Sequence, residues 1–166
     1  MARARSADGP STPATAALDR ADVVYRRHPY AHDPAAPSYG LEAAEALGVA
    51  PERVLKTLLV DTGAGLAVGI VPVAGQLDLK AMAAALGAKS VRMADTAAAE
   101  RSSGYVVGGI SPVGQRRPLP TVLDESAFDH ATVYVSGGRR GFDLELSPVD
   151  LLAVTGASRA PIGRPT

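Results

Sequence analysis

Apolar residues recur at two spacings along this chain, and the two spacings predict a mixture of strands and helices. Apolar or alternating runs rich in β-branched residues predict strands at 22–30, 53–60, 66–73, 121–124, 132–136 and 142–147, with a short extended piece at 89–93. Apolar residues three and four apart predict helices at 14–21, 39–49, 77–87, 94–102 and 147–156.

Helix-capping residues support these boundaries. Thr12-Pro13 is typical of a helix start, and Asp95 and Ser147 are expected to be N-caps. We therefore predict a disordered tail at 1–12 and one domain at 13–160, with a frayed end at 159–166. Several strand pairs are joined by short turns, such as DTGAG at 61–65, so the predicted class is α/β with a bent, mixed, largely antiparallel sheet flanked by helices.

Composition narrows the function. Of 166 residues 46% are apolar, which suits an ordinary core, and 17 basic residues balance 17 acidic ones. A polyanion would therefore have to bind a local patch, such as one of the three arginine doublets. The absence of Cys excludes disulfides, thiolate metal sites and a cysteine nucleophile. Without a secretory signal or an apolar run of about 20 residues, the chain is expected to be cytoplasmic.

Lys56 is the first candidate for chemistry. Strand alternation places it with Val54 and Leu58 on one face, opposite Thr57, and both faces are largely apolar. An ammonium among apolar residues is costly unless it is paired or used. The alternative is a lysine near the strand end that extends into water.

The segment 104–120, GYVVGGISPVGQRRPLP, is the second candidate. Gly108-Gly109 would let a ligand approach the backbone closely, and successive amides there could form an oxyanion hole. The alternative is a bent loop between a helix and a strand. The segment has neither the dinucleotide-binding glycine pattern nor that of a P-loop.

Other polar groups favour structural interpretations. His28, His32 and Asp33 could bind a metal, but prolines interrupt any helix that would align them, and no further cluster completes a site. Asp143 and Glu145 alternate with apolar residues, which by itself predicts a solvated strand face.

Seven segments in order resemble the YbaK/EbsC family of aminoacyl-tRNA deacylases, and within it the Cys-tRNA(Pro) deacylases. They are HPYAHDP, YGLEAAEALGV, VLKTLLV, VAGQLDLK, MADTAAAERSSGYVVGGISPVGQ, YVSGGRRG and DLELSP, and they span about residues 25–150. The resemblance implies a trans-editing hydrolase that removes Cys from mischarged tRNA(Pro), with the substrate's own thiol as nucleophile and no metal or cofactor. A separate hydrolytic site is needed because an apolar pocket distinguishes amino acids of similar size by only about 1–3 kcal/mol of binding free energy.

The resemblance also implies the site residues. Lys56, Gly108 and Gly109 would be catalytic, by orienting the ester and stabilising the oxyanion. Arg116 and Arg139 are predicted from charge alone to contact tRNA phosphate. The substrate-binding residues would be Tyr30, Tyr39, Thr57, Ile110, Ser111, Pro112, Gly114, Ser136 and Asp143.

Three alternatives remain open at this stage. The protein could remove another amino acid, such as Ala from tRNA(Pro), because pocket size decides among relatives. It could instead hold tRNA or a synthetase without catalysis, or bind a free nucleotide. Near-zero net charge predicts modest, salt-sensitive tRNA affinity, with selectivity for tRNA(Pro) supplied by prolyl-tRNA synthetase as partner.

Overall fold

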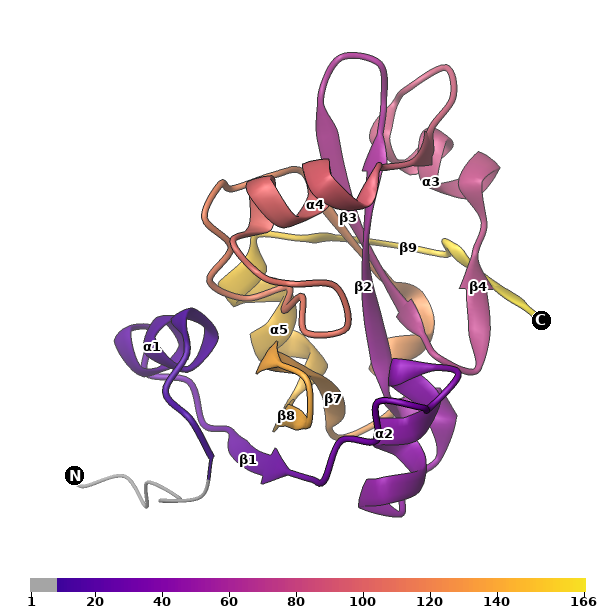
Figure 1. Cartoon of the computed structure of the whole chain (residues 1–166). Helices are drawn as coiled ribbons and strands as arrows, with labels where there is room; N and C mark the ends of the chain where they lie inside the picture. The colour runs from indigo at the N-terminus through magenta and orange to yellow at the C-terminus, as the bar shows by residue number, and fades with distance from the viewer. Residues whose placement is uncertain (1–8) are drawn as a thin grey trace.

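The computed structural model describes residues 9–166, which form five α-helices, ten strands and two short 3-10 helices (Figure 1). The helices are α1 Pro13–Arg20, α2 Tyr39–Leu47, α3 Leu79–Leu86, α4 Thr96–Ser103 and α5 Pro148–Thr155. The strands are β1 Arg26–Pro29, β2 Leu55–Asp61, β3 Leu66–Pro72, β4 Gly75–Leu77, β5 Arg92–Met93, β6 Thr121–Asp124, β7 Val133–Arg139, β8 Phe142–Leu146, β9 Ser158–Ala160 and β10 Gly163–Pro165.

The strands form two main sheets and one small pair. A mixed five-stranded sheet has the order β5-β2-β3-β6-β9, with antiparallel pairing around β2 and parallel pairing of β3 with β6 and β6 with β9. An antiparallel sheet has the order β1-β8-β7, and β4 pairs with β10. The predicted α/β class with a mixed, largely antiparallel sheet is confirmed, although the strands form three sheets.

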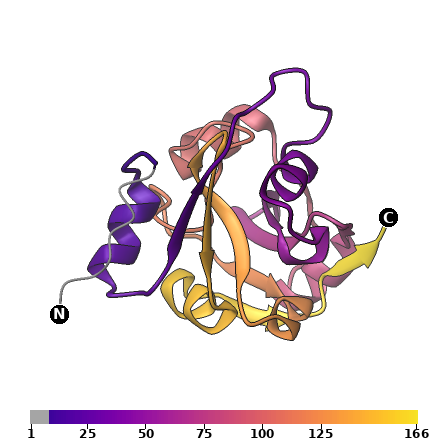
Figure 2. The same ribbon diagram turned by 90° about the horizontal axis from the view of Figure 1, so that it is seen from below.

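The main core lies between the two larger sheets. Leu59 and Ile70 of the five-stranded sheet share one apolar cluster with Val135 and Leu144 of the three-stranded sheet, and α1 and α5 complete the cluster. In Figure 2 the helix α1 lies beside this layered body at the N-terminal side. A second cluster joins the opposite face of the five-stranded sheet to α3, where Met82 is completely buried. No helix in the described part of the chain combines the length and apolar character needed to cross a membrane.

Capping chemistry sets the helix boundaries as the sequence indicates. The Thr12, Asp95 and Ser147 side chains all accept amide hydrogen bonds at N-cap positions. Gly48 ends α2 with φ of +67°, a conformation that glycine adopts without strain. The expected helix at 77–87 begins later, because Asp78 is the N-cap and residues 75–77 form β4.

The predicted N-terminal tail extends too far. Residues 1–8 of that prediction lie outside the described residues. Thr12 is buried, and its hydroxyl donates to the Gly137 carbonyl oxygen at 2.6 Å. At Gly9 a Cβ atom would lie 2.6 Å from the Phe142 ring, so the backbone there packs directly on the aromatic face. The folded part therefore begins before Pro13.

The prediction of a frayed C-terminus is wrong, because residues 158–160 form β9 and residues 163–165 form β10. Asp124 at the end of β6 is buried, and its carboxylate accepts the amides of Ile162 at 2.9 Å and Gly163 at 2.8 Å. Ile162 is itself completely buried against the second apolar cluster. One carboxylate thus fixes the turn between the last two strands.

Replacement of Asp124 by Ala should therefore destabilise the whole protein by about 2–5 kcal/mol, because the buried Ile162 amide and the partly buried Gly163 amide lose a charged acceptor. Urea unfolding measures this loss, and hydrogen exchange should show faster exchange at Ile162 and Gly163. Glu125→Ala is the matched control, since the neighbouring Glu125 is exposed and, among the described residues, makes only a surface pair with Arg159 at 3.7 Å. Equal stability of the two variants would contradict the anchoring role of Asp124.

Candidate active site

The candidate site lies along an open edge of β2. Val73 donates its amide to the Val54 carbonyl and Thr62 donates to the Gly65 carbonyl, so the even-numbered residues of β2 bond to β3. The odd-numbered residues direct their amides and carbonyls to the other edge. On that edge β5 pairs only with Val60 and Asp61, and a single bridge joins Val54 to Tyr134. Within the described residues, no strand pairs with this edge at Thr57.

A cavity of about 440 Å³ occupies this edge, between β2, α2, the start of α4 and the ends of β7 and β8. That volume is in the range of small-molecule sites. Eight of the residues predicted from the sequence line it: Tyr30, Tyr39, Lys56, Thr57, Gly108, Ile110, Ser136 and Asp143.

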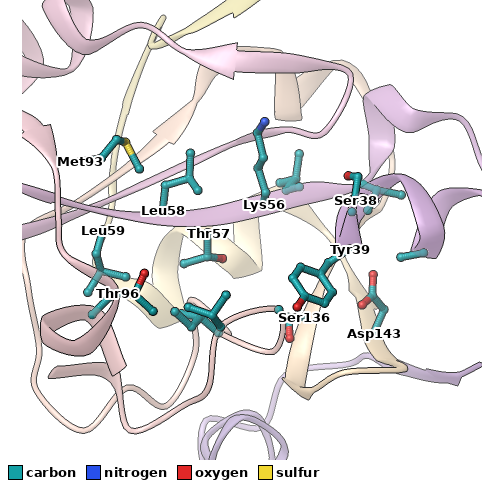
Figure 3. Close-up of a pocket in the computed structure, with 18 of the residues that line it drawn as sticks. Ser38, Tyr39, Lys56, Thr57, Leu58, Leu59, Met93, Thr96, Ser136 and Asp143 are labelled. Atoms are coloured by element: carbon teal, nitrogen blue, oxygen red, sulfur yellow. The ribbon is translucent and has the colours of Figure 1, made fainter. Parts of the chain in front are cut away.

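The polar groups divide between the two sides of β2. Figure 3 shows the Thr57, Tyr39, Ser136 and Asp143 side chains on one side of the strand and the Lys56 side chain extending from the other. Alternation along a strand requires this separation of Lys56 from Thr57. Both residues line one cavity because the unpaired edge between them is open to a ligand.

Lys56 has no anionic partner among the residues described. It is half-buried, and desolvation lowers the pKa of its ammonium group below the usual value. A lysine that extends freely into water, which was the alternative considered from the sequence, does not account for this burial. The side chain is partly desolvated beside a cavity that could receive a negatively charged group.

Asp143 is the most perturbed acid that faces the cavity. It is 6% exposed, and burial raises the pKa of its carboxyl to about 7. No hydrogen bond or ion pair to this carboxyl occurs within residues 9–166, and Lys56 is not among the causes of its shift. Burial and the nearby Asp143 charge also raise the pKa of the Tyr30 phenol.

The expectation that Asp143 and Glu145 lie on a solvated face is wrong. Helix α2 covers that face of the three-stranded sheet, where Tyr134, the strand partner of Glu145, packs against Ala43 and Ala44. Glu145 is 15% exposed and contacts the His28 ring nitrogen at 2.9 Å. Both faces of β8 are therefore covered.

Gly108 forms part of the cavity wall and packs closely on its surroundings. Its φ is +87°, and a Cβ atom would lie 2.8 Å from the Tyr39 ring. The Arg140 side chain contacts the same part of the wall. Its Nε donates to the Val107 carbonyl at 2.9 Å, and its guanidinium lies 5.1 Å from the centre of the Tyr39 ring. Arg140 therefore joins the glycine-rich segment to the wall formed by α2.

Gly109 does not fit the oxyanion role predicted for it. Its amide already donates to the Val106 carbonyl at 2.9 Å, and it is absent from the cavity lining. A Cβ atom at Gly109 would lie 3.0 Å from the Arg139 backbone, so close packing accounts for this glycine.

Direct substrate contacts by Ser111, Pro112 and Gly114 are not supported either. None of the three lines the cavity, and Ser111 is completely buried, where its hydroxyl accepts the Val113 amide. Gly114 has φ of +72° and packs on α1, where a Cβ atom would lie 2.5 Å from the Pro13 carbonyl oxygen. Most of the glycine-rich segment thus forms scaffold rather than a ligand loop.

Arg116 and Arg139 are exposed and do not line the cavity, so their phosphate contacts stay predictions. Arg140, the neighbour of Arg139, is the arginine at the site, and sequence reasoning missed it. Charge alone could not distinguish the two arginines of this doublet, because only the fold brings Arg140 to the Val107 carbonyl. Ser38 and Thr96 were also missed, since each serves at the start of a helix.

The histidines of the metal hypothesis are held apart by different acids. His28 contacts Glu145, and the His32 Nδ1 lies 2.8 Å from the Glu42 carboxylate. Residues 9–166 contain no group of three side chains suited to a metal ion.

The site therefore offers a buried carboxyl, a partly desolvated ammonium and several hydroxyls around an open strand edge. The Thr57 hydroxyl is buried without a hydrogen-bond partner in the described structure, so a ligand could satisfy it. Such a constellation can bind a small ligand that carries both a cationic group and an ester or phosphate oxygen.

Comparison with known proteins gives relatives that match this chain in sequence and in fold. The family model of the aminoacyl-tRNA editing domain matches residues 33–154. A candidate Cys-tRNA(Pro)/Cys-tRNA(Cys) deacylase of Enterococcus faecalis, EbsC, is 39% identical over 120 residues, which are 72% of this chain and 73% of that protein.

Solved structures with the same fold support this family match. The structure of a candidate trans-editing enzyme for prolyl-tRNA synthetase is 27% identical with a TM-score of 0.79, covering 94% of this chain and 99% of its own. A structure described only as a hypothetical protein is 28% identical with a TM-score of 0.82, covering 92% and 100%. These matches confirm the resemblance inferred from the seven sequence segments. The chain belongs to the aminoacyl-tRNA editing domain family.

Proposed function

We propose that this protein hydrolyses the ester of mischarged Cys-tRNA(Pro), acting in trans to prolyl-tRNA synthetase in the cytoplasm. The observation that carries the proposal is the open-edge cavity, where the buried Asp143 carboxyl and the Lys56 ammonium lie without protein partners among the described residues. An aminoacyl ester has complementary groups, namely an α-ammonium and an ester linked to a ribose. The EbsC relative supports the choice of Cys.

Asp143 is the proposed partner of the substrate's α-ammonium group. A buried carboxylate without a cation is destabilised, and a bound ammonium would remove that penalty. The Thr57 and Ser136 hydroxyls lie on the same side of β2 (Figure 3) and would hydrogen-bond the aminoacyl group. Tyr30, beside Asp143, would keep its phenol protonated as a donor, because its pKa is raised.

Lys56 is proposed to act from the other side of the open edge. Its ammonium would offset negative charge on the ester oxygens or hold the terminal nucleotide. The Gly108 backbone and the Tyr39 ring would form the wall against which the terminal adenosine lies.

The proposed nucleophile is the substrate's own thiol. Its sulfur forms a bond to the carbonyl carbon, the bond from that carbon to the ribose oxygen breaks, and the thiol proton ends on the ribose oxygen. The products are free tRNA and a four-membered cyclic thioester, which water opens to cysteine. The protein then contributes orientation and charge rather than a nucleophile.

Recognition of tRNA(Pro) is proposed to come from the synthetase. The EbsC relative is named for Cys-tRNA(Cys) as well as Cys-tRNA(Pro), which fits a cavity that selects the amino acid rather than the tRNA. The chain's zero formal net charge also predicts modest tRNA affinity of its own.

Hydrolysis of Cys-, Ala- and Ser-tRNA(Pro) by wild type and Lys56→Ala tests the function. We expect rapid loss of the Cys ester alone, and at least a 100-fold lower rate for Lys56→Ala, since a charge aimed at a developing oxyanion contributes about 2.7–4 kcal/mol. The control Lys89→Ala removes an exposed lysine and should keep full activity.

The other outcomes of this assay separate the alternatives. Loss of Ser and Cys esters at equal rates would exclude a role for the thiol. Loss of the Ala ester with the Cys ester spared would identify a deacylase for Ala. Binding of charged tRNA without hydrolysis of any ester would show a binding module.

Asp143 should also make stability depend on pH. The unfolded carboxyl releases its proton near its usual pKa of 3.8, whereas the folded one releases it at about 7, so the folded state binds more protons between these values. Stability should therefore fall as pH rises from about 4 to 7, at about 1.4 kcal/mol per pH unit at most.

Urea unfolding of wild type and Asp143→Asn at pH 4–8 measures this effect. The variant should be less sensitive to pH over this range and more stable than wild type at pH 8. Asp129→Asn, which changes an exposed acid, should follow the wild-type curve. Identical pH dependence in wild type and Asp143→Asn would show that this carboxyl is not destabilised by burial.

A further inference from the structure

A second cavity, of about 460 Å³, lies on another face of α4. Thr96 and Ala99 of this helix line the first cavity, whereas Arg101 and Ser102 line the second. Successive residues of an α-helix are rotated by about 100° around its axis, so these two pairs point to different sides of α4. The turn between β2 and β3 and the segment before β6 complete the second cavity through Gly65, Leu66, Arg117 and Leu119.

Two guanidinium groups meet at this cavity without acids. Arg101 and Arg117 are both exposed, and neither makes an ion pair or side-chain hydrogen bond within the described chain. No acidic residue is among the cavity lining. The cavity therefore attracts an anion, in a protein whose formal net charge is zero.

Main-chain hydrogen bonds join the two segments that carry these arginines. The Arg117 amide donates to the Ser102 carbonyl at 3.2 Å, and the Arg116 amide donates to the Ser103 carbonyl at 2.9 Å. These bonds tie the segment that carries Arg117 to the last turn of α4, which carries Arg101. The two side chains thus start from one rigid base.

Ser102 supplies an independent sign of a ligand. It is 7% exposed, and its hydroxyl is buried without a hydrogen-bond partner in residues 9–166. Buried polar groups nearly always make a hydrogen bond, so an unpaired hydroxyl beside two arginines indicates that a ligand supplies the acceptor. A phosphate has enough acceptor oxygens for two guanidinium groups and one hydroxyl.

We propose that this second cavity binds a backbone phosphate of the tRNA strand whose 3′ end enters the first cavity. The proposal rests on the proposed function for the identity of that strand. Helix α4 has eight residues and is therefore about 12 Å long. Successive phosphates of a nucleic-acid strand lie several ångströms apart, so a phosphate within a few nucleotides of the 3′ end comes within reach.

Binding of uncharged tRNA to Arg101→Gln, Arg117→Gln and the double variant tests this without any hydrolysis. Fluorescence anisotropy at several salt concentrations gives the affinity and its salt dependence. We expect the double variant to bind at least 10-fold more weakly. Its plot of log affinity against log salt should be shallower by about 0.7–0.9, the value for one phosphate contact.

Each single variant should show a smaller change in slope than the double variant, because the remaining arginine still contacts the same phosphate. Ser102→Ala should weaken binding several-fold and leave the slope unchanged, since no charge is lost. The matched control is Lys80→Gln with Arg164→Gln, which removes two exposed cations from α3 and β10, on the other side of the five-stranded sheet from α4. Circular dichroism confirms that every variant is folded.

The proposal is overturned if the double variant keeps the wild-type affinity and slope, or if the control pair loses as much. Inorganic phosphate and adenosine monophosphate form a second arm. If either raises the melting temperature of wild type but not of the double variant, while tRNA binding is unchanged, the cavity binds a free phosphate and the tRNA assignment is wrong. Because no ester is cleaved, a failure here is distinct from a failure of the deacylation assay.

Discussion

The structure depends on the incomplete pairing of β2. This strand is bonded along its whole length to β3, but within residues 9–166 its other edge is bonded only near its end, where Val60 and Asp61 pair with β5 and the Leu59 carbonyl accepts the Ala94 amide. An unpaired strand edge exposes main-chain donors and acceptors, which usually invites association with another strand. Here α2, the start of α4 and the ends of β7 and β8 surround the edge and convert it into a cavity.

The open edge also explains how two charged groups of opposite sign can share one cavity without neutralising each other. Lys56 and Asp143 lie on opposite sides of β2 (Figure 3), and neither is among the causes of the other's pKa shift. A direct ion pair would stabilise both charges and leave little for a substrate. Their separation leaves two sites of unsatisfied charge, one for a cation and one for an anion.

The glycine-rich segment has a different role from the one that its composition suggests. Gly114 lets the chain pass against the start of α1, and Gly109 lets it pass against the backbone of β7. Gly108 alone among these three lines the cavity. The density of glycine thus reflects the crowding of a loop between a helix, a strand and an aromatic ring.

The sequence by itself determined the local elements and the family. The sequence predicts the N-caps at Thr12, Asp95 and Ser147 and the apolar faces of the helices, because capping and periodicity depend on residues that are close together in the chain. Eight of the predicted site residues line one cavity, and they were chosen from the resemblance of whole segments rather than from any one spacing.

Only the tertiary structure decided which groups are buried, paired or open. The alternation within its strand predicts that Asp143 is solvated, but the residue is buried because α2 covers that face of the sheet. The C-terminus is ordered because Asp124 accepts the amides of Ile162 and Gly163. Arg140 is held beside the cavity wall because the fold brings its side chain to the Val107 carbonyl. These properties arise from contacts between residues far apart in the chain, and a one-dimensional pattern carries no record of such contacts.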